Sequence, residues 1–278
     1  MRSALILLFV CLGSAHAEGV PLNFDLQTNL PLAHVMRDGP VADASQTGFV
    51  KYLRDMRGRW TLGVDHEGSK AALIPGLQGN LWLPGGGDLP KTGLALEVRF
   101  APLGKGQRVD VFFNGKKLAN KVLKPGWQTH RIKVPEGAVK VSDNHVRLHF
   151  RRSVPHLGKK TAAAIRYVRL TTQTAPAAPL DEAKIAAALS ASDSVGLVVP
   201  DGAGLDYFVV PPAGARLRGT VTSGTVDVWI QESGRSPRRL GGGAKIDLPL
   251  KNGGKPIRLM LRGQGAARLS GARIVSAS

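Results

Sequence analysis

The chain has 278 residues, enough for one large domain or for two domains of about 100 residues each. It carries 38 lysines and arginines against 20 aspartates and glutamates, and this excess of positive charge predicts attraction to polyanions. With 34 glycines, 18 prolines and a single cysteine, the composition favours a turn-rich all-β protein and excludes an intramolecular disulfide.

Residues 1–17 have the three parts of a secretory signal peptide. Arg2 supplies the positive start, residues 4–12 form the apolar region, and Ala15-His16-Ala17 has the small-x-small pattern of a cleavage site. The cysteine, Cys11, lies inside this segment in a context that does not match a lipid-attachment motif. We therefore expect an extracytoplasmic protein, periplasmic or secreted, with no transmembrane segment after cleavage.

Short alternating runs follow, and they predict a first β-sandwich domain over residues 18–172. Apolar residues in these runs recur at every second position, which places them on one face of a strand. The strand candidates before residue 108 are 22–26, 34–36, 49–53, 60–64, 77–83 and 94–100.

Residues 108–152 give the clearest strand and turn signals. Asn114-Gly115 follows the alternating run 109–113 and predicts a tight type I′ hairpin turn. Pro125-Gly126 and a later Pro-Glu-Gly run bound the next strand candidate, 127–134. In the last candidate, 145–151, Val146, Leu148 and Phe150 fall on one face, while the opposite face carries His145, Arg147, His149 and Arg151.

Residues 173–194 are predicted to be a linker. Its first part is rich in proline and alanine, and residues 181–189 form a helix candidate with acidic residues in the first turn, which suits a packing strut between domains. A second, smaller β-sandwich domain is expected over 195–278, because five elements recur there in the same order as in the first. The second-domain elements are 205–221, 226–230, 245–249, 257–261 and 271–275, and their first-domain counterparts are 81–100, 109–113, 131–135, 146–150 and 164–170.

Four motifs in the first domain resemble those of galactose-binding-like jelly rolls. They are the run 111–115 ending in Asn-Gly, the pair Gly126-Trp127, the run 132–135 ending in proline, and the run 144–148 of the form Asn-x-h-x-h. The resemblance covers residues 71–170 and, more weakly, 197–275. It implies two jelly-roll-like, carbohydrate-binding-module-like β-sandwich domains in tandem, similar to those that precede secreted sulfatase-type hydrolases.

No catalytic constellation stands out. The sequence has no G-x-S-x-G motif and no Cys/Ser-x-Pro-x-Arg motif of the sulfatase type, and the strand carboxylates show no spacing that singles out a pair. His145 and His149 lie about 13 Å apart along an extended strand, too far to share one zinc ion. We predict no cofactor, although the resemblance implies a structural calcium ion for which Asp25, Asp38 and Asp43 are candidates.

The basic strand faces are the functional lead. Trp127, Arg131 and Lys133 share one side of their strand, and Arg and Lys pair well with sulfate, carboxylate or phosphate groups. The alternative is a solvated face with Trp127 packed in a core. The six candidate ligand-binding residues are Trp127, Arg131, Lys133, Arg147, His149 and Arg151.

These features predict a non-catalytic exported protein that binds an anionic polysaccharide or cell-envelope polymer. Two other functions stay open at this point. The chain could be an accessory or truncated N-terminal part of a sulfatase-like hydrolase, with a separate hydrolase as its partner, or it could be a structural envelope protein. The charge also suits nucleic acid, but export argues against nucleic acid as the physiological partner.

Overall fold

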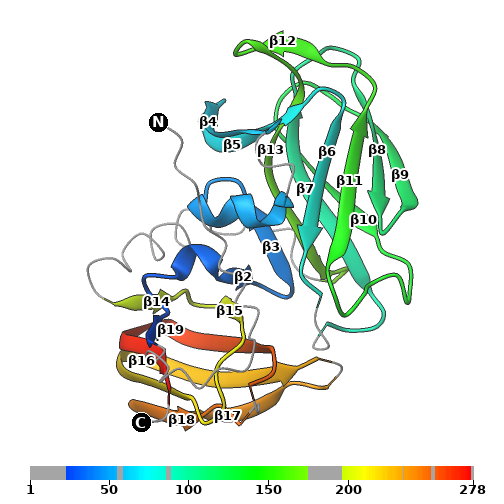
Figure 1. Cartoon of the computed structure of the whole chain (residues 1–278). Coiled ribbons are helices and arrows are strands. Elements are labelled where there is room, and N and C mark those ends of the chain that lie inside the picture. Colours follow the sequence, from blue (N-terminus) through cyan, green and yellow to red (C-terminus); the bar gives the residue numbers. More distant parts are fainter. Residues whose placement is uncertain are drawn as a thin grey trace, which may run out of the picture.

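The computed structural model describes residues 23–54, 59–85, 89–174, 196–233, 235–251 and 254–276 (Figure 1). The predicted signal peptide and almost all of the predicted linker, with its helix, lie outside these ranges. The described part is nearly all β, which confirms the predicted fold class, and its strands form antiparallel sheets. Two short 3-10 helices accompany them, η1 (Leu30–Leu32) and η2 (Thr47–Tyr52). In these ranges we find no helix with the length and apolar character needed to span a membrane.

The first lobe is a sandwich of two sheets. Both layers bury the apolar residues of their alternating strands, so that Val111, Leu148 and Phe100 have no exposed surface. One layer has the order β10 (Gln128–Lys133), β7 (Leu94–Pro102), β13 (Lys159–Thr172) and β3 (Pro40–Asp43). Strands β5 (Ser69–Pro75) and β12 (Val154–His156) also pair with β13, and β4 (Thr61–His66) pairs with β5. The other layer has the order β6 (Gln78–Leu83), β11 (Asn144–Phe150), β8 (Arg108–Phe113) and β9 (Lys116–Val122).

The hairpin between β8 and β9 has the predicted turn. Asn114 and Gly115 both have positive φ, 49° and 84°, as a type I′ turn requires. The Asn114 side chain also ties the turn to the next strand, because its Oδ1 accepts a hydrogen bond from the backbone N–H of His145 at 2.9 Å. The Asn-Gly pair therefore fixes the register of the four-stranded sheet at this end.

One predicted strand, 49–53, is wrong. Residues 49–52 belong to η2 and Leu53 is its C-cap. Phe49, Tyr52 and Leu53 are buried at the spacing of a helical turn, and not at every second position. The Tyr52 hydroxyl donates to the Val41 carbonyl at 2.9 Å and so holds η2 against β3. A run of five residues with four apolar ones is compatible with a strand or a helical turn, and here the tertiary contacts select the helical turn.

The second lobe is organised by two long strands, β16 (Arg216–Glu232) and β19 (Ile257–Val275). Each passes from one layer of the lobe to the other, with positive φ at Gly224 and Gly265 where their pairing register shifts. The remaining strands flank this pair: β1 (Asn23–Asp25), β14 (Leu197–Val199), β15 (Gly204–Val209), β17 (Arg238–Gly242) and β18 (Lys245–Pro249).

Strand pairing recurs between the lobes, as the repeated order of elements predicts. The first half of β16 pairs with β18 and the second half with β17, as β7 pairs with β10 and β8 with β9. The first half of β19 pairs with β15 and the second half with β1 and β14, as β11 pairs with β6, and β13 with β3 and β5. In the second lobe β16 thus takes the places of β7 and β8, and β19 the places of β11 and β13.

The N-terminal segment joins the lobes. Strand β2 (His34–Met36) pairs with β3 on one side and with β15 on the other, so one sheet runs from the first lobe into the second. Residues 23–36 fall in the range expected for the first domain, yet β1 and β2 both pair with strands of the second lobe. Tyr167 of β13 likewise packs in the apolar cluster of the second lobe.

The surroundings of a histidine at this junction predict a pH-dependent stability. The His34 ring contacts Tyr52 and Phe208 edge-on at 5.2 Å, and its buried Nδ1 has no hydrogen-bond partner among the described residues. Burial, with Lys51 and Arg258 nearby, holds the pKa of His34 well below its ordinary value of 6.5. The folded protein therefore favours the neutral ring, whereas the unfolded chain binds a proton below pH 6.5.

We expect the free energy of unfolding to be highest above pH 6.5 and to fall with acidification below it. The His34 contribution to this fall is at most about 1.4 kcal/mol per pH unit. Urea titrations above and below that pH measure it. The His34→Gln variant should lose part of the pH dependence, while the exposed His149→Gln control should keep it; equal slopes in wild type and His34→Gln would contradict the assignment.

Candidate ligand-binding face

The structure divides the six candidate residues between two sheets. Trp127, Arg131 and Lys133 lie at β10, in the layer formed with β7 and β13. Arg147 and His149 lie on β11 and Arg151 directly follows it, in the four-stranded sheet. The outward faces of the two sheets of a sandwich point in opposite directions, so these residues do not form one basic surface.

Trp127 is held by packing. Its ring contacts the small apolar cluster of Ala71, Leu73 and Ala164, and its Nε1 donates to the backbone carbonyl of His66 at 3.2 Å. The guanidinium carbon of Arg99 lies 5.7 Å from the ring centroid. These contacts anchor the Gly-Trp turn to the edge formed by β4 and β5.

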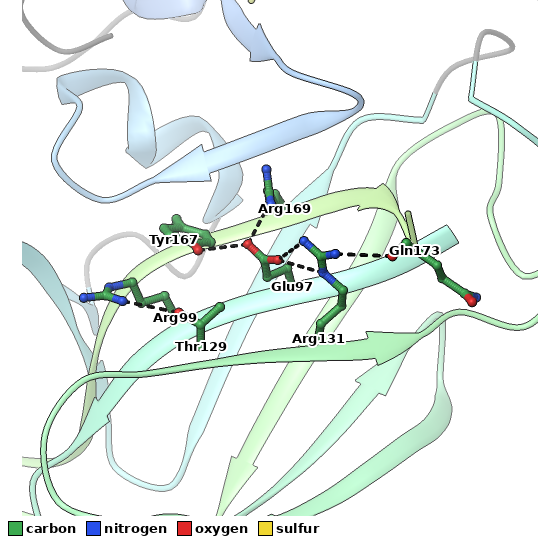
Figure 2. A network of polar contacts seen from close by, with 7 residues as sticks. All are labelled: Glu97, Arg99, Thr129, Arg131, Tyr167, Arg169 and Gln173. Carbon is green, nitrogen blue, oxygen red and sulfur yellow. Dashed lines mark hydrogen bonds and ion pairs between the residues drawn. The ribbon is translucent and has the colours of Figure 1, made fainter. Parts of the chain in front are cut away.

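The Arg131 side chain belongs to a network of hydrogen bonds and ion pairs around Glu97 (Figure 2). Its Nε and Nη2 donate to Glu97 Oε2 at 2.9 and 2.7 Å, while Tyr167 and Arg169 donate to Oε1 at 2.9 and 2.8 Å. The glutamate is only 1 % exposed. Its carboxylate is therefore satisfied inside the protein, and Arg131 is positioned by that ion pair. On this strand Lys133 remains exposed.

The outward side of the four-stranded sheet, which we call the open face, carries polar and aromatic side chains in rows across the strands. Pairing register places Arg147 of β11 between Asn80 of β6 and Phe112 of β8. Lys117 of β9 continues that row. The neighbouring rows are Gln78, His149, Asp110 and Asn120 on one side and Trp82 with His145 on the other.

Phe112 holds the central cation of the open face. The guanidinium carbon of Arg147 lies 4.0 Å from the Phe112 ring centroid, close enough for a cation–π contact. Its buried Nε has no hydrogen-bond partner in the part of the chain that the structure describes. The guanidinium is thus fixed in place by an aromatic ring, and no carboxylate neutralises it through that nitrogen.

The carboxylate on the open face is already paired. Asp110 accepts from Lys117 at 2.7 Å and from Asn120 at 2.6 Å. Hydrogen bonds from Lys117 and Asn120 lower the pKa of Asp110, so this group stays ionised and bound to them. Exposed His149 lies opposite Asp110 on the next strand.

A small hollow adjoins the open face where Trp82 and His145 meet. Their rings stack at 4.8 Å with a 20° angle, and the guanidinium carbon of Arg54 lies 5.0 Å from the Trp82 ring. Burial, followed by the charges of Arg147 and Arg54, lowers the pKa of His145, which favours the neutral ring. The hollow has a volume of about 310 Å³ and is lined by Arg54, Trp82, Asn114, Lys140, Ser142, Asp143 and His145.

Two residues of this face were missed by sequence reasoning, although the signal was present. Trp82 stands between buried Leu81 and Leu83, and Phe112 stands between two buried residues of β8. Alternation alone therefore places both aromatic rings on the outward side.

Two of the three carboxylates suggested for calcium, Asp25 and Asp43, make hydrogen bonds or ion pairs with other groups of the protein. Asp43 is buried and pairs with Arg166, and its Oδ1 accepts from the Ser45 backbone at 2.8 Å. Asp25 accepts from the Thr28 backbone at 2.8 Å. The described ranges hold no group of three or more His, Cys, Asp or Glu side chains that could bind a metal ion.

Comparison with known proteins gives neither a matching family model nor a matching curated protein. Among solved structures, the chain is similar to dimeric latent PorU from Porphyromonas gingivalis, at 9 % identity and a TM-score of 0.33, over 92 % of this chain and 22 % of that chain. It is also similar to an anti-sigma factor domain-containing protein, at 11 % identity and a TM-score of 0.19, over 71 % and 77 % of the two chains.

A third similar structure is a mutant salicylate 1,2-dioxygenase from Pseudoaminobacter salicylatoxidans, at 13 % identity and a TM-score of 0.17, over 98 % and 89 % of the two chains. The chain spans less than a quarter of the PorU chain. Such TM-scores carry no functional argument. What the open face can bind therefore follows from its own residues.

Proposed function

We propose that this is a non-catalytic, exported protein that binds an anionic glycan or cell-envelope polymer on the open face. In this proposal the first lobe is a galactose-binding-like jelly roll, as the motifs at 111–148 suggest, and residues 1–17 direct export. The observation that carries the proposal is the position of Arg147, fixed over Phe112 in the middle of a polar sheet face.

The surroundings of Arg147 favour an anionic ligand. A guanidinium held by a ring needs little reorganisation to meet a sulfate, carboxylate or phosphate group. Lys117 lies in the same cross-strand row as Arg147, on the far side of Phe112. Exposed His149 and Arg151 follow Arg147 along the chain at alternate positions. The carboxylate within these rows, Asp110, is occupied by Lys117 and Asn120.

The same rows also suit sugar hydroxyls. Gln78, Asn80 and Asn120 place amide groups beside the cations, and amides can both donate and accept hydrogen bonds. Gln78 and Asn80 already hydrogen-bond each other at 3.2 Å, which orients the pair. A polymer with alternating hydroxyl and anionic groups would therefore find both kinds of partner on one face.

Binding to immobilised heparin, used as a model sulfated glycan, tests this proposal. Wild-type protein should be retained at low salt and released as salt increases, because ion-pair binding is screened. Arg147→Ala should weaken binding at low salt by about tenfold or more, since a charged hydrogen bond contributes about 1.5–3 kcal/mol.

The control is Lys133→Ala, which removes an exposed cation from β10 in the opposite sheet. It should elute at a salt concentration only slightly below that of wild type, because the loss of one exposed positive charge weakens the general attraction to heparin. If Arg147→Ala elutes with wild type, or if Lys133→Ala loses as much affinity, the open face is not the binding surface.

A further inference from the structure

The repeat places a second hollow at the position equivalent to the first. Taking Val228 of β16 as the equivalent of Val111 of β8, the aligned rows are Val228–Leu261–Leu205 and Val111–Leu148–Gly79. Three positions from the Gly79–Leu148 pair, Trp82 of β6 pairs with His145 of β11. Three positions from the Leu205–Leu261 pair, in the same direction, Phe208 of β15 pairs with Arg258 of β19. Phe208 thus occupies the place of Trp82, and Arg258 that of His145.

This second hollow is an apolar groove of about 650 Å³ between the lobes. Phe208 and Val210 line it from the second lobe at 51 % and 64 % exposure, and Val141 lines it from the first lobe at 62 %. These three are among only nine large hydrophobic side chains that the described residues expose. Their convergence on one groove marks it as a surface suited to an apolar ligand.

Besides Lys140, two charged side chains line the groove, Glu232 and Arg258, and both are paired, Glu232 with Arg235. Arg258 donates from Nε to Asp206 Oδ2 at 2.6 Å and from Nη1 to Gln231 Oε1 at 3.2 Å. Asp206 also pairs with Arg262. The floor therefore offers the packed surface of a neutralised ion pair, and the walls of Phe208 and Val210 supply the apolar contact.

One loop separates the groove from the polar hollow beside the open face. Lys140 and Ser142 line both cavities, while Val141 lines the groove alone. In the part of the chain that the structure describes, the Lys140 ammonium makes no ion pair. A cation thus stands at the point where an apolar groove meets a polar hollow.

We propose that the groove binds the acyl chain of an anionic amphiphile, with the charged head group at Lys140. Charge complementarity selects an anionic head, and the groove walls select an alkyl chain. The ligand of the open face would then be a glycolipid, with its acyl chain in the groove and its saccharide over the open face. This inference rests on the proposed function for the saccharide part of the ligand.

Dodecanoate, kept below its micelle concentration, is the probe for calorimetric titration of the full chain. Val210→Asp should weaken its binding about tenfold, because one valine contact contributes about 1.5 kcal/mol. Leu157→Asp is the matched control, since Leu157 is equally exposed at 64 % but lies in the turn between β12 and β13. It should bind dodecanoate like wild type.

Lys140→Gln separates the head group from the chain. It should weaken dodecanoate binding and leave the binding of uncharged dodecanol unchanged, which supports the assignment of the anionic head to Lys140. Absence of dodecanoate binding by wild type, or equal binding by Val210→Asp and Leu157→Asp, would overturn the inference.

Heparin retention by the same variants distinguishes the two proposals. If heparin retention depends on Arg147 but dodecanoate does not bind, the groove inference falls and the proposed function stands. If dodecanoate binds with the expected sensitivity to Val210→Asp but heparin retention is independent of Arg147, the groove stands as an acyl-chain site and the glycolipid assignment is overturned together with the proposed function.

Discussion

Replacing Asp206 by alanine should lower the free energy of unfolding by about 3–5 kcal/mol, the cost of leaving a buried charge without its partner. Asp206 has no exposed surface, and its two carboxylate oxygens bind Arg258 and Arg262. It also lies where β15 pairs with β2, opposite His34. Without it, the buried Arg258 would lose its ion pair at the junction of the lobes.

Urea denaturation of the variant and wild type measures this effect. Asp227→Ala provides the control, because Asp227 pairs with Arg239 on the same sheet but its side chain is 44 % exposed. Surface ion pairs contribute at most about 1 kcal/mol, so this control should change little. Similar losses in the two variants would show that the Asp206 network does not stabilise the junction.

Glu97→Ala should have an effect of the same size, about 3–5 kcal/mol, in the first lobe. Glu97 joins three strands, because Arg131 of β10 and both Tyr167 and Arg169 of β13 donate to its carboxylate (Figure 2). Its removal leaves Arg169, which is 2 % exposed, without this ion pair. Glu97→Gln keeps the shape and one acceptor oxygen, so it should cost less than Glu97→Ala.

The acid side of the stability profile provides a second test of Glu97. Burial by itself would raise its pKa, but hydrogen bonds from Arg169 and Arg131 outweigh burial and hold the pKa below the ordinary value of 4.5. The contribution of Glu97 to the free energy of unfolding is therefore complete above pH 4.5 and is lost as the pH falls through the lower pKa of the folded state. In Glu97→Gln the free energy of unfolding should depend less steeply on pH below 4.5 than in wild type. An unchanged pH dependence in this range would contradict the assignment.

Local sequence patterns predicted much of the fold for a clear physical reason. Alternation identifies which side chains of a strand are buried, and Asn114-Gly115 specifies a turn by its backbone requirements. The repeated order of elements also predicted the recurring strand pairing. It did not predict that β16 and β19 each run continuously where the first lobe has two separate strands. Gly224 and Gly265 lie at bends within these strands, and glycine is equally common in the turns that end a strand, so the sequence does not distinguish a bend from a turn.

The candidate site was harder to predict because its residues belong to strands that pair over long sequence distances. Alternation correctly put Arg131 and Arg147 on outward faces. It does not say which sheet a strand joins, and β10 pairs with β7 while β11 pairs with β6 and β8. Likewise, nothing local to Arg131 indicates that Glu97 will meet it across the sheet.

The position of a bound polymer on the protein is the decisive test of whether the open face is the binding surface. Backbone amide hydrogen exchange should be measured with and without a heparin oligosaccharide at low salt. Bound oligosaccharide should add protection in β8, β9 and β11, around Phe112, Lys117 and Arg147, and leave β10 unchanged. Protection centred on β10 near Lys133, or no protection of the four-stranded sheet by a ligand that binds, would contradict it.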